Sequence, residues 1–229
     1  MNLTFFIVDD TRVKLEPLED DPNSDYINAC YITVSYRLMS LYYHIPGPIE
    51  VNLEEFIRMI WDVDASKIVM LTNLFENAIE KCKQYWPNIG KTQQYGQINM
   101  KLIKEEVYAH FTIREIQITK NSNSRIFRQY HYTSWPDKGV PSDIASLVEF
   151  RNKVNKSSSK RPGPMIVHCS AGIGRTGTYL ALDYLIQQAQ AENSVDIFSC
   201  VSQMRQERVN MVQTVVSSEI YMENMRKII

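Results

Sequence analysis

The segment MIVHCSAGIGRTG at 165–177 constrains the fold of this chain more than any other stretch. Its apolar start predicts a short buried strand over 164–168, and a helical pattern begins near Arg175. Between them lie small residues, with glycines at 172, 174 and 177, which suit close backbone approach better than core packing. The sequence therefore predicts a strand, a tight loop and a helix in direct succession.

Such a loop at the start of a helix favours an anion, because unpaired backbone N–H groups and the helix dipole both attract negative charge. Phosphate is the expected ligand of this loop. Cys169 stands at the mouth of the loop, where the same amides and Arg175 favour its thiolate, the nucleophilic form. Arg175 offers a planar fork for two oxygens of a phosphoryl group. A buried structural cysteine is the alternative interpretation, and the surrounding glycines argue against it.

Length and charge exclude several classes of protein. The 229 residues, 44% of them hydrophobic, suffice for one large domain over 1–229. A formal net charge of -1 gives no reason to expect nucleic acid or an anionic membrane as partner, so an anion site must be local. The oligomeric state is left open by these data.

The cysteines indicate a reducing compartment. All four are scattered, without CxxC spacing or a histidine cluster, which disfavours a zinc site and a disulfide framework, and we expect neither a metal nor a cofactor. The opening MNLTFFIVDD lacks a basic leader, and no window approaches the length of a membrane span. We therefore expect a cytoplasmic location, or the intracellular part of a longer membrane-tethered protein.

Helix and strand patterns alternate along the chain. Helical spacing over 52–63 precedes an apolar strand over 67–72, and 96–119 and 124–135 have the composition of antiparallel strands. The tract 156–164 is predicted as a surface loop within one domain. Two helices are predicted over 178–190 and 195–208, with Asn193 and Ser194 as cap residues between them.

HCSAGIGRTG resembles the signature of the cysteine-dependent protein tyrosine phosphatases. Four further segments are similar to the same family in the same order: DYINACYI (25–32), KCKQYWP (81–87), WPDKGVP (135–141) and VNMVQT (209–214). The resemblance covers most of the chain. It implies a single α/β domain with a strongly twisted mixed sheet flanked by helices, and a phosphate-binding loop between a strand and a helix.

The resemblance also implies roles for individual residues. Cys169 would be the nucleophile and Arg175 the phosphate clamp, while Asp137 would be the general acid on the mobile loop that contains Trp135. Gln213 would position the hydrolytic water. The backbone amides that bind substrate would come from Ser170, Ala171, Gly172, Ile173 and Gly174. The implied partners are proteins or peptides that carry phosphotyrosine.

A supporting set of side chains is implied around the loop. Thr176 would donate a hydrogen bond to the cysteine sulfur and ease breakdown of the phosphocysteine. Glu76 would pair with and orient Arg175, and His168 would form a hydrogen bond with Tyr85. Together these contacts would fix the loop in place.

Three features depart from the family pattern. From the resemblance we expect the domain to lack the family's usual N-terminal helices, and the position of the tyrosine that walls the family's pocket falls near Asn2. Ser217 replaces a second glutamine, and Pro46, Gly47 and Pro48 replace Gln-Gly-Pro. These differences affect substrate recognition more than chemistry.

Three functions are therefore considered. The first is hydrolysis of phosphotyrosine, and the second is binding of phosphotyrosine without turnover. The third is hydrolysis of another phosphorylated substrate such as a phosphoinositide. Asp137 argues against the second, and the lack of a dense basic patch around the signature argues against the third.

Overall fold

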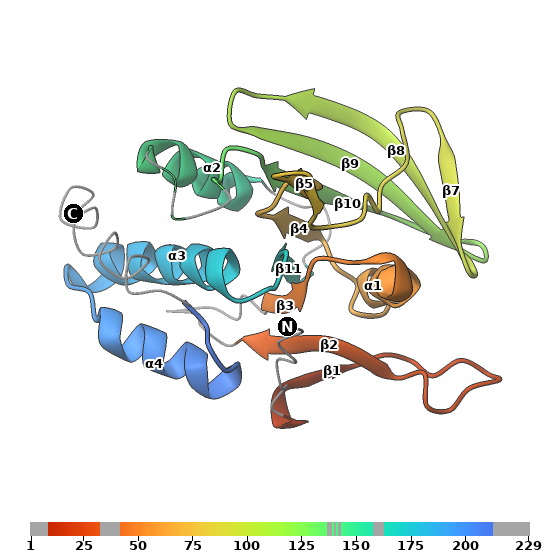
Figure 1. Ribbon diagram of the computed structural model, residues 1–229, viewed down its shortest axis with the longest axis horizontal. Coiled ribbons are helices and arrows are strands. Elements are labelled where there is room, and N and C mark those ends of the chain that lie inside the picture. Colours follow the sequence, from red (N-terminus) through yellow and green to blue (C-terminus); the bar gives the residue numbers. More distant parts are fainter. Residues whose placement is uncertain are drawn as a thin grey trace.

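A computed structural model of the chain describes residues 9–32, 42–136, 139, 141, 143–157 and 163–212. Its centre is a twisted nine-stranded sheet (Figure 1). In spatial order the strands are β1 (Arg12–Lys14), β2 (Tyr26–Ile32), β3 (Tyr42–Pro46), β11 (Met165–Cys169), β4 (Lys67–Met70), β10 (Asn123–Tyr132), β9 (Phe111–Lys120), β8 (Ile98–Val107) and β7 (Thr92–Tyr95).

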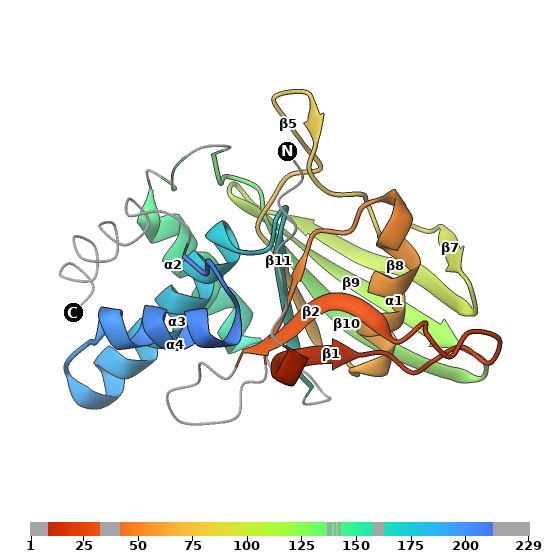
Figure 2. The same cartoon turned by 60° about the horizontal axis from the view of Figure 1, so that its bottom comes forward.

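The sheet is mixed, as the sequence analysis predicts. Strands β3, β11, β4 and β10 run parallel to one another at its centre, and the pairs on either side of them are antiparallel. Because β11 is central, its carboxyl end opens at the edge where open α/β sheets bind their ligands. A separate hairpin of β5 (Phe75–Glu76) and β6 (Ile79–Glu80) projects from the sheet (Figure 2).

Helices cover both faces of the sheet. The first helix, α1 (Leu53–Asp62), lies on one face, while α2 (Ile144–Lys156), α3 (Gly174–Glu192) and α4 (Ile197–Glu207) gather on the other (Figure 1). Short 3₁₀ turns, η1 (Asp9–Thr11) and η2 (Glu50–Asn52), complete the described elements. This arrangement is the single α/β domain that the sequence predicts.

Two hydrophobic clusters follow from the alternation of side chains along the central strands. Ile166 of β11 packs in the cluster that includes Phe56 of α1, while its neighbour Val167 packs with Phe150 of α2 and Leu185 of α3. Successive strand residues point to opposite faces, so an apolar run such as MIV must be covered on both sides. The helices provide that cover.

Most predicted elements are present. The helix predicted over 52–63 is α1, the strand predicted over 67–72 is β4, and the strand predicted over 164–168 is β11. The region 96–119 contains β8 and β9, which pair antiparallel. The loop predicted over 156–164 begins one residue late, since Lys156 ends α2, and its positions 158–162 lie outside the described residues.

One of the two predicted cap residues is wrong. Asn193 does cap the C-terminus of α3, in the left-handed conformation with φ 56°. Ser194 does not cap α4. The N-cap is Asp196, two residues further along the chain than expected. Its carboxylate accepts a hydrogen bond from the Ser199 amide at 2.9 Å.

Candidate active site

The predicted phosphate-binding loop joins β11 to α3. Cys169 is the last residue of β11 and only 4% exposed, and α3 begins at Gly174, as the sequence predicts. The Gly172 amide donates to Cys169 Sγ at 3.2 Å. Gly172 has φ +68°, and a Cβ atom there would lie 2.8 Å from the Ile45 carbonyl oxygen. Only glycine fits this turn, which points an amide at the sulfur.

The Pro46–Gly47–Pro48 segment supports the loop from behind. The Gly47 amide donates to the Ser170 carbonyl at 3.0 Å. A Cβ atom on Gly47 would come within 2.5 Å of the Cys169 carbonyl oxygen, so two backbones meet here without room for a side chain. The glycine of this segment is therefore essential to the approach of the two backbones. Among the other loop residues, Ala171 is exposed and Ile173 is buried.

Arg175 and Glu76 form the ion pair that the sequence analysis expects. Arg175 Nη1 donates to Glu76 Oε1 at 2.5 Å, and Nη2 donates to Oε2 at 2.8 Å. The same guanidinium donates to the carbonyls of Leu71 at 3.2 Å and Pro136 at 3.1 Å. A guanidinium held by a carboxylate at two points is fixed in orientation, which suits the recognition of a planar set of oxygens.

The contact with Pro136 links the loop to the segment that contains the expected acid. Trp135 is 3% exposed and packs edge-on against Tyr132, with ring centroids 6.2 Å apart. Its indole donates to the Gly139 carbonyl at 3.2 Å, four residues further along the chain. Asp137 itself lies outside the described residues. Its neighbour Pro136 nevertheless lies against the arginine of the phosphate-binding loop.

A buried hydrogen-bonded chain ends at the backbone of Cys169. Gln129 Nε2 donates to the Tyr85 hydroxyl at 2.7 Å, and that hydroxyl lies 3.0 Å from His168 Nε2. His168 Nδ1 lies 3.2 Å from the Cys169 carbonyl. Burial lowers the pKa of His168 to about 3, so its imidazole is neutral. We infer that Tyr85 donates to Nε2 and that Nδ1–H donates to the carbonyl.

The start of α3 meets the segment that follows α4. Thr176 is fully buried, and its hydroxyl has no hydrogen-bond partner in the described part of the chain, so the expected hydrogen bond to the Cys169 sulfur is not formed in this structure. A Cβ atom on Gly177 would lie 2.5 Å from the Val212 amide nitrogen. Val212 has φ 56°, a strained conformation for a β-branched residue, directly before the expected water-positioning Gln213. Gln213 lies outside the described residues.

Comparison with known proteins agrees with this geometry. The family model of the protein-tyrosine phosphatases matches residues 2–224. The chain belongs to the protein-tyrosine phosphatase family. It is 41% identical over 205 residues to receptor-type tyrosine-protein phosphatase U of Gallus gallus, covering 89% of this chain and 14% of that protein.

Two further receptor-type relatives show the same extent of similarity. Receptor-type tyrosine-protein phosphatase eta of Gallus gallus is 42% identical over 210 residues, covering 90% of this chain and 15% of that protein. Receptor-type tyrosine-protein phosphatase zeta of Rattus norvegicus is 41% identical over 218 residues, covering 90% of this chain and 9% of that protein. The chain thus spans less than a sixth of the length of each of these relatives.

Several residues of this phosphatase site carry no signal in the sequence. Gln129 holds Tyr85, although it lies in a strand pattern with no chemical motif. Arg205 donates to the Met211 and Val212 carbonyls, both at 3.0 Å, and thereby holds the segment before Gln213. Leu71 contributes only its backbone carbonyl. A backbone acceptor and a distant strand residue can be located only from the folded chain.

Metal-binding clusters and disulfides are not part of the described site. No group of three or more His, Cys, Asp or Glu residues in the described ranges could hold a metal ion. The four cysteines are buried free thiols.

No described helix has the length and apolar character to cross a membrane. Two departures from the family pattern, Asn2 and Ser217, fall outside the described residues.

Proposed function

We propose that residues 1–229 form one catalytic domain that hydrolyses phosphotyrosine in proteins through a phosphocysteine intermediate. The observation that carries this proposal is the placement of Cys169 Sγ 3.2 Å from the Gly172 amide, on a loop whose arginine is fixed by two contacts with Glu76. A sulfur that accepts a backbone N–H bond in an electropositive loop is suited to nucleophilic attack.

The first chemical step transfers the phosphoryl group to sulfur. The Cys169 thiolate attacks phosphorus, the bond between phosphorus and the phenolic oxygen breaks, and the leaving phenolate takes a proton from Asp137. Arg175 and the loop amides bind the non-bridging oxygens, whose negative charge they stabilise in the transition state. We assign these amides to Ser170, Ala171, Gly172, Ile173 and Gly174.

The second step releases phosphate. Gln213 positions a water molecule, the Asp137 carboxylate accepts its proton, and the oxygen attacks phosphorus as the bond between phosphorus and sulfur breaks. Thr176 donates a hydrogen bond to the sulfur as it regains negative charge, which stabilises the departing thiolate. The unpartnered hydroxyl of Thr176 supports this role, because a buried hydroxyl without a partner lowers stability, and a catalytic role explains why such a group is kept.

The cellular setting is part of the proposal. The relatives carry names of receptor-type tyrosine-protein phosphatases, and this chain matches only a small share of each. We propose that the domain acts in the cytoplasm, as the intracellular part of a longer membrane-tethered protein or in a form without a tether. Its substrates there are phosphotyrosine-containing proteins.

Turnover of a phosphotyrosine peptide, compared with a soluble phosphoinositide under the same conditions, tests the proposed substrate class. We expect the peptide to be hydrolysed with the higher kcat/KM, and the Cys169→Ser variant to bind the peptide without releasing phosphate, because the loop amides and Arg175 remain. Faster hydrolysis of the phosphoinositide would overturn the substrate class. Binding of the peptide without turnover by the unmodified chain would favour a binding module.

The role of Asp137 is tested separately by varying the leaving group. Asp137→Ala should slow hydrolysis of phosphotyrosine far more than hydrolysis of nitrophenyl phosphate, since nitrophenolate departs without a proton. Equal losses on the two substrates would remove Asp137 from the role of general acid.

A further inference from the structure

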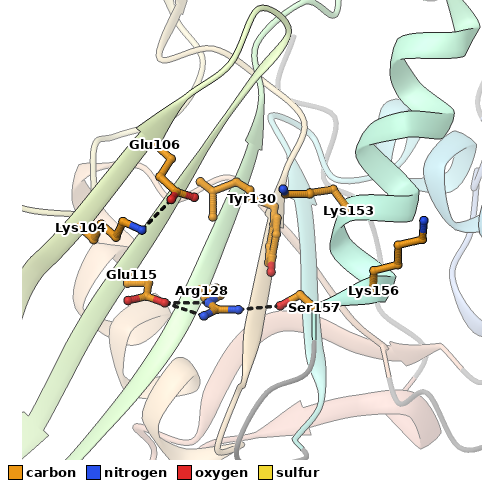
Figure 3. Close-up of a pocket in the computed structure, with 9 residues that line it drawn as sticks. Lys104, Glu106, Glu115, Arg128, Tyr130, Lys153, Lys156 and Ser157 are labelled. Carbon is orange, nitrogen blue, oxygen red and sulfur yellow. Dashed lines mark hydrogen bonds and ion pairs between the residues drawn. The ribbon is translucent and has the colours of Figure 1, made fainter.

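A hollow of about 380 Å³ lies between the end of α2 and the strands β8, β9 and β10 (Figure 3). Its lining contains none of the residues assigned to the chemistry above. Ile113 and Tyr130 are almost completely buried where they line the hollow, at 7% and 1% exposure. The other lining residues are polar or charged: Lys104, Glu106, Glu115, Arg128, Lys153, Lys156 and Ser157.

Positive charge exceeds negative charge in this hollow. Four of the lining residues are cationic and two are carboxylates, so the formal excess is two positive charges in a chain whose net charge is -1. Both carboxylates are already paired. Lys104 Nζ lies 2.6 Å from Glu106 Oε1, and Arg128 Nη2 lies 2.6 Å from Glu115 Oε1. An incoming anion therefore meets no uncompensated carboxylate.

The excess charge belongs to two lysines in the last turn of α2. Neither Lys153 nor Lys156 has a carboxylate within ion-pair distance in the part of the chain that the structure describes. Lys153 Nζ lies 5.2 Å from the centre of the Tyr108 ring, and its side chain reaches across the hollow toward the strands (Figure 3). The Lys156 ammonium turns outward in that view, on a flexible stem that can swing inward.

The helix dipole favours lysines at this end of α2, but it does not explain why a fixed guanidinium faces them. Arg128 donates from Nε and Nη2 to Glu115 Oε1, at 2.9 and 2.6 Å, and from Nη1 to Ser157 Oγ at 2.9 Å. Its orientation is thus set by β9 and by Ser157, the residue that directly follows α2. A cation held in place loses little conformational freedom when a ligand binds.

We propose that this hollow binds a phosphomonoester dianion carried by a peptide side chain, namely phosphoserine or phosphothreonine. A dianion matches the excess of two charges, whereas a polyphosphorylated ligand would bring more negative charge than the lining neutralises. The volume is larger than a phosphate ion needs, and the methylene stems of the lining lysines offer apolar contact to the carbon atoms of the side chain. The site is separate from the catalytic loop and does not depend on turnover there.

The test measures binding of a fluorescent phosphoserine peptide to the full chain by anisotropy. All variants carry Arg175→Met, which removes the clamp of the catalytic loop so that this loop does not compete for the phosphate. We expect saturable binding that weakens as ionic strength rises. Lys153→Glu combined with Lys156→Glu should raise Kd by about tenfold or more. The matched control, Lys14→Glu with Lys91→Glu, makes the same charge change at exposed sites outside the hollow.

Two further measurements complete the test. The unphosphorylated peptide should bind about tenfold more weakly than the phosphopeptide. Inorganic phosphate should displace the phosphopeptide only at a much higher concentration than the peptide's own. Displacement at equal concentration would show that the hollow binds a free ion, and it would overturn the proposal of a peptide ligand. Equal Kd values for the hollow and control variants would also overturn the proposal. If the glutamate variant melts at a lower temperature than the control, Lys153→Gln with Lys156→Gln gives the same comparison with a smaller charge change.

Discussion

Arg151 of α2 and Asp183 of α3 form a buried ion pair, in which Arg151 Nε donates to Asp183 Oδ1 at 2.5 Å and the two side chains are 7% and 4% exposed. The same carboxylate accepts from the Tyr42 hydroxyl at 2.5 Å, from Asn155 at 2.7 Å and from Gln187 at 2.9 Å. The pair joins the helix that follows the acid-bearing segment to the helix that follows the phosphate-binding loop. These two elements are thus held together by one saturated carboxylate.

Asp183→Asn should destabilise the domain strongly. The substitution leaves the Arg151 guanidinium buried without an opposite charge, and breaking such a pair costs about 3–5 kcal/mol. The free energy of unfolding in urea measures the effect. Glu149→Gln on the exposed side of α2 is the matched control, with an expected change below about 0.5 kcal/mol. A loss below about 1 kcal/mol for Asp183→Asn would mean that the pair does not hold the helices together.

Glu76→Gln should reduce kcat/KM by about tenfold or more, because Arg175 loses the charge that fixes its two Nη atoms. Steady-state kinetics on nitrophenyl phosphate provide the measurement. Glu80→Gln is the control on the same hairpin, since Glu80 is exposed and pairs with Lys83 at 3.2 Å rather than with the loop. Comparable rates for the two variants would show that Arg175 is oriented without Glu76.

Stability should fall as the pH is lowered from about 7.5 to 5.5. Burial lowers the pKa of His168 to about 3 and of His131 to about 4, and it lowers that of His44 well below its usual value of 6.5. These residues stay neutral in the folded chain and take up protons in the unfolded chain below pH 6.5. Their contribution is therefore fully present above pH 6.5 and is lost toward pH 3, by up to about 1.4 kcal/mol per pH unit for each histidine. Urea unfolding across this range measures the slope.

His44→Leu tests the origin of that slope. His44 is fully buried, and neither ring nitrogen has a hydrogen-bond partner among the described residues. Replacing an unsatisfied buried ring by an apolar side chain should stabilise the fold by about 1–3 kcal/mol. It should also reduce the slope of the unfolding free energy against pH, because about one proton fewer is taken up on unfolding. A variant that is less stable than the parent at pH 7.5 would show that the imidazole has a partner in solution.

Gly177→Ala should reduce turnover more than it reduces stability. The added Cβ atom would come within 2.5 Å of the Val212 amide nitrogen, and Val212 directly precedes Gln213. Displacing this segment should misplace the water that hydrolyses the phosphocysteine, so the intermediate should accumulate. Rapid-quench kinetics would detect a burst of product followed by a slow steady state. A proportional loss of both chemical steps would place the effect in the phosphate-binding loop instead.

The sequence by itself determined the local parts of this site. The strand, loop and helix at 164–177 are set by apolar periodicity and by glycines whose neighbours lie within a few residues, so local sequence alone places Cys169 and Arg175 on one loop. The helices α1, α3 and α4 follow from the same local periodicity. The expected pairs of Glu76 with Arg175 and of His168 with Tyr85 come from the resemblance and not from spacing.

Tertiary structure decided the rest. The sequence analysis does not predict the helix α2. Its apolar residue Phe150 is buried only because it packs against Phe111 and Tyr132 of the sheet. The Leu71 carbonyl and the Gln129 amide reach the site only because β4 lies between β11 and β10 in the sheet. The hollow beside Lys153 is lined by three consecutive strands and the helix that follows them, and its side chains meet only because α2 packs back against these strands. Long-range strand pairing sets the contacts of Leu71 and Gln129, and no local pattern encodes which strands become neighbours.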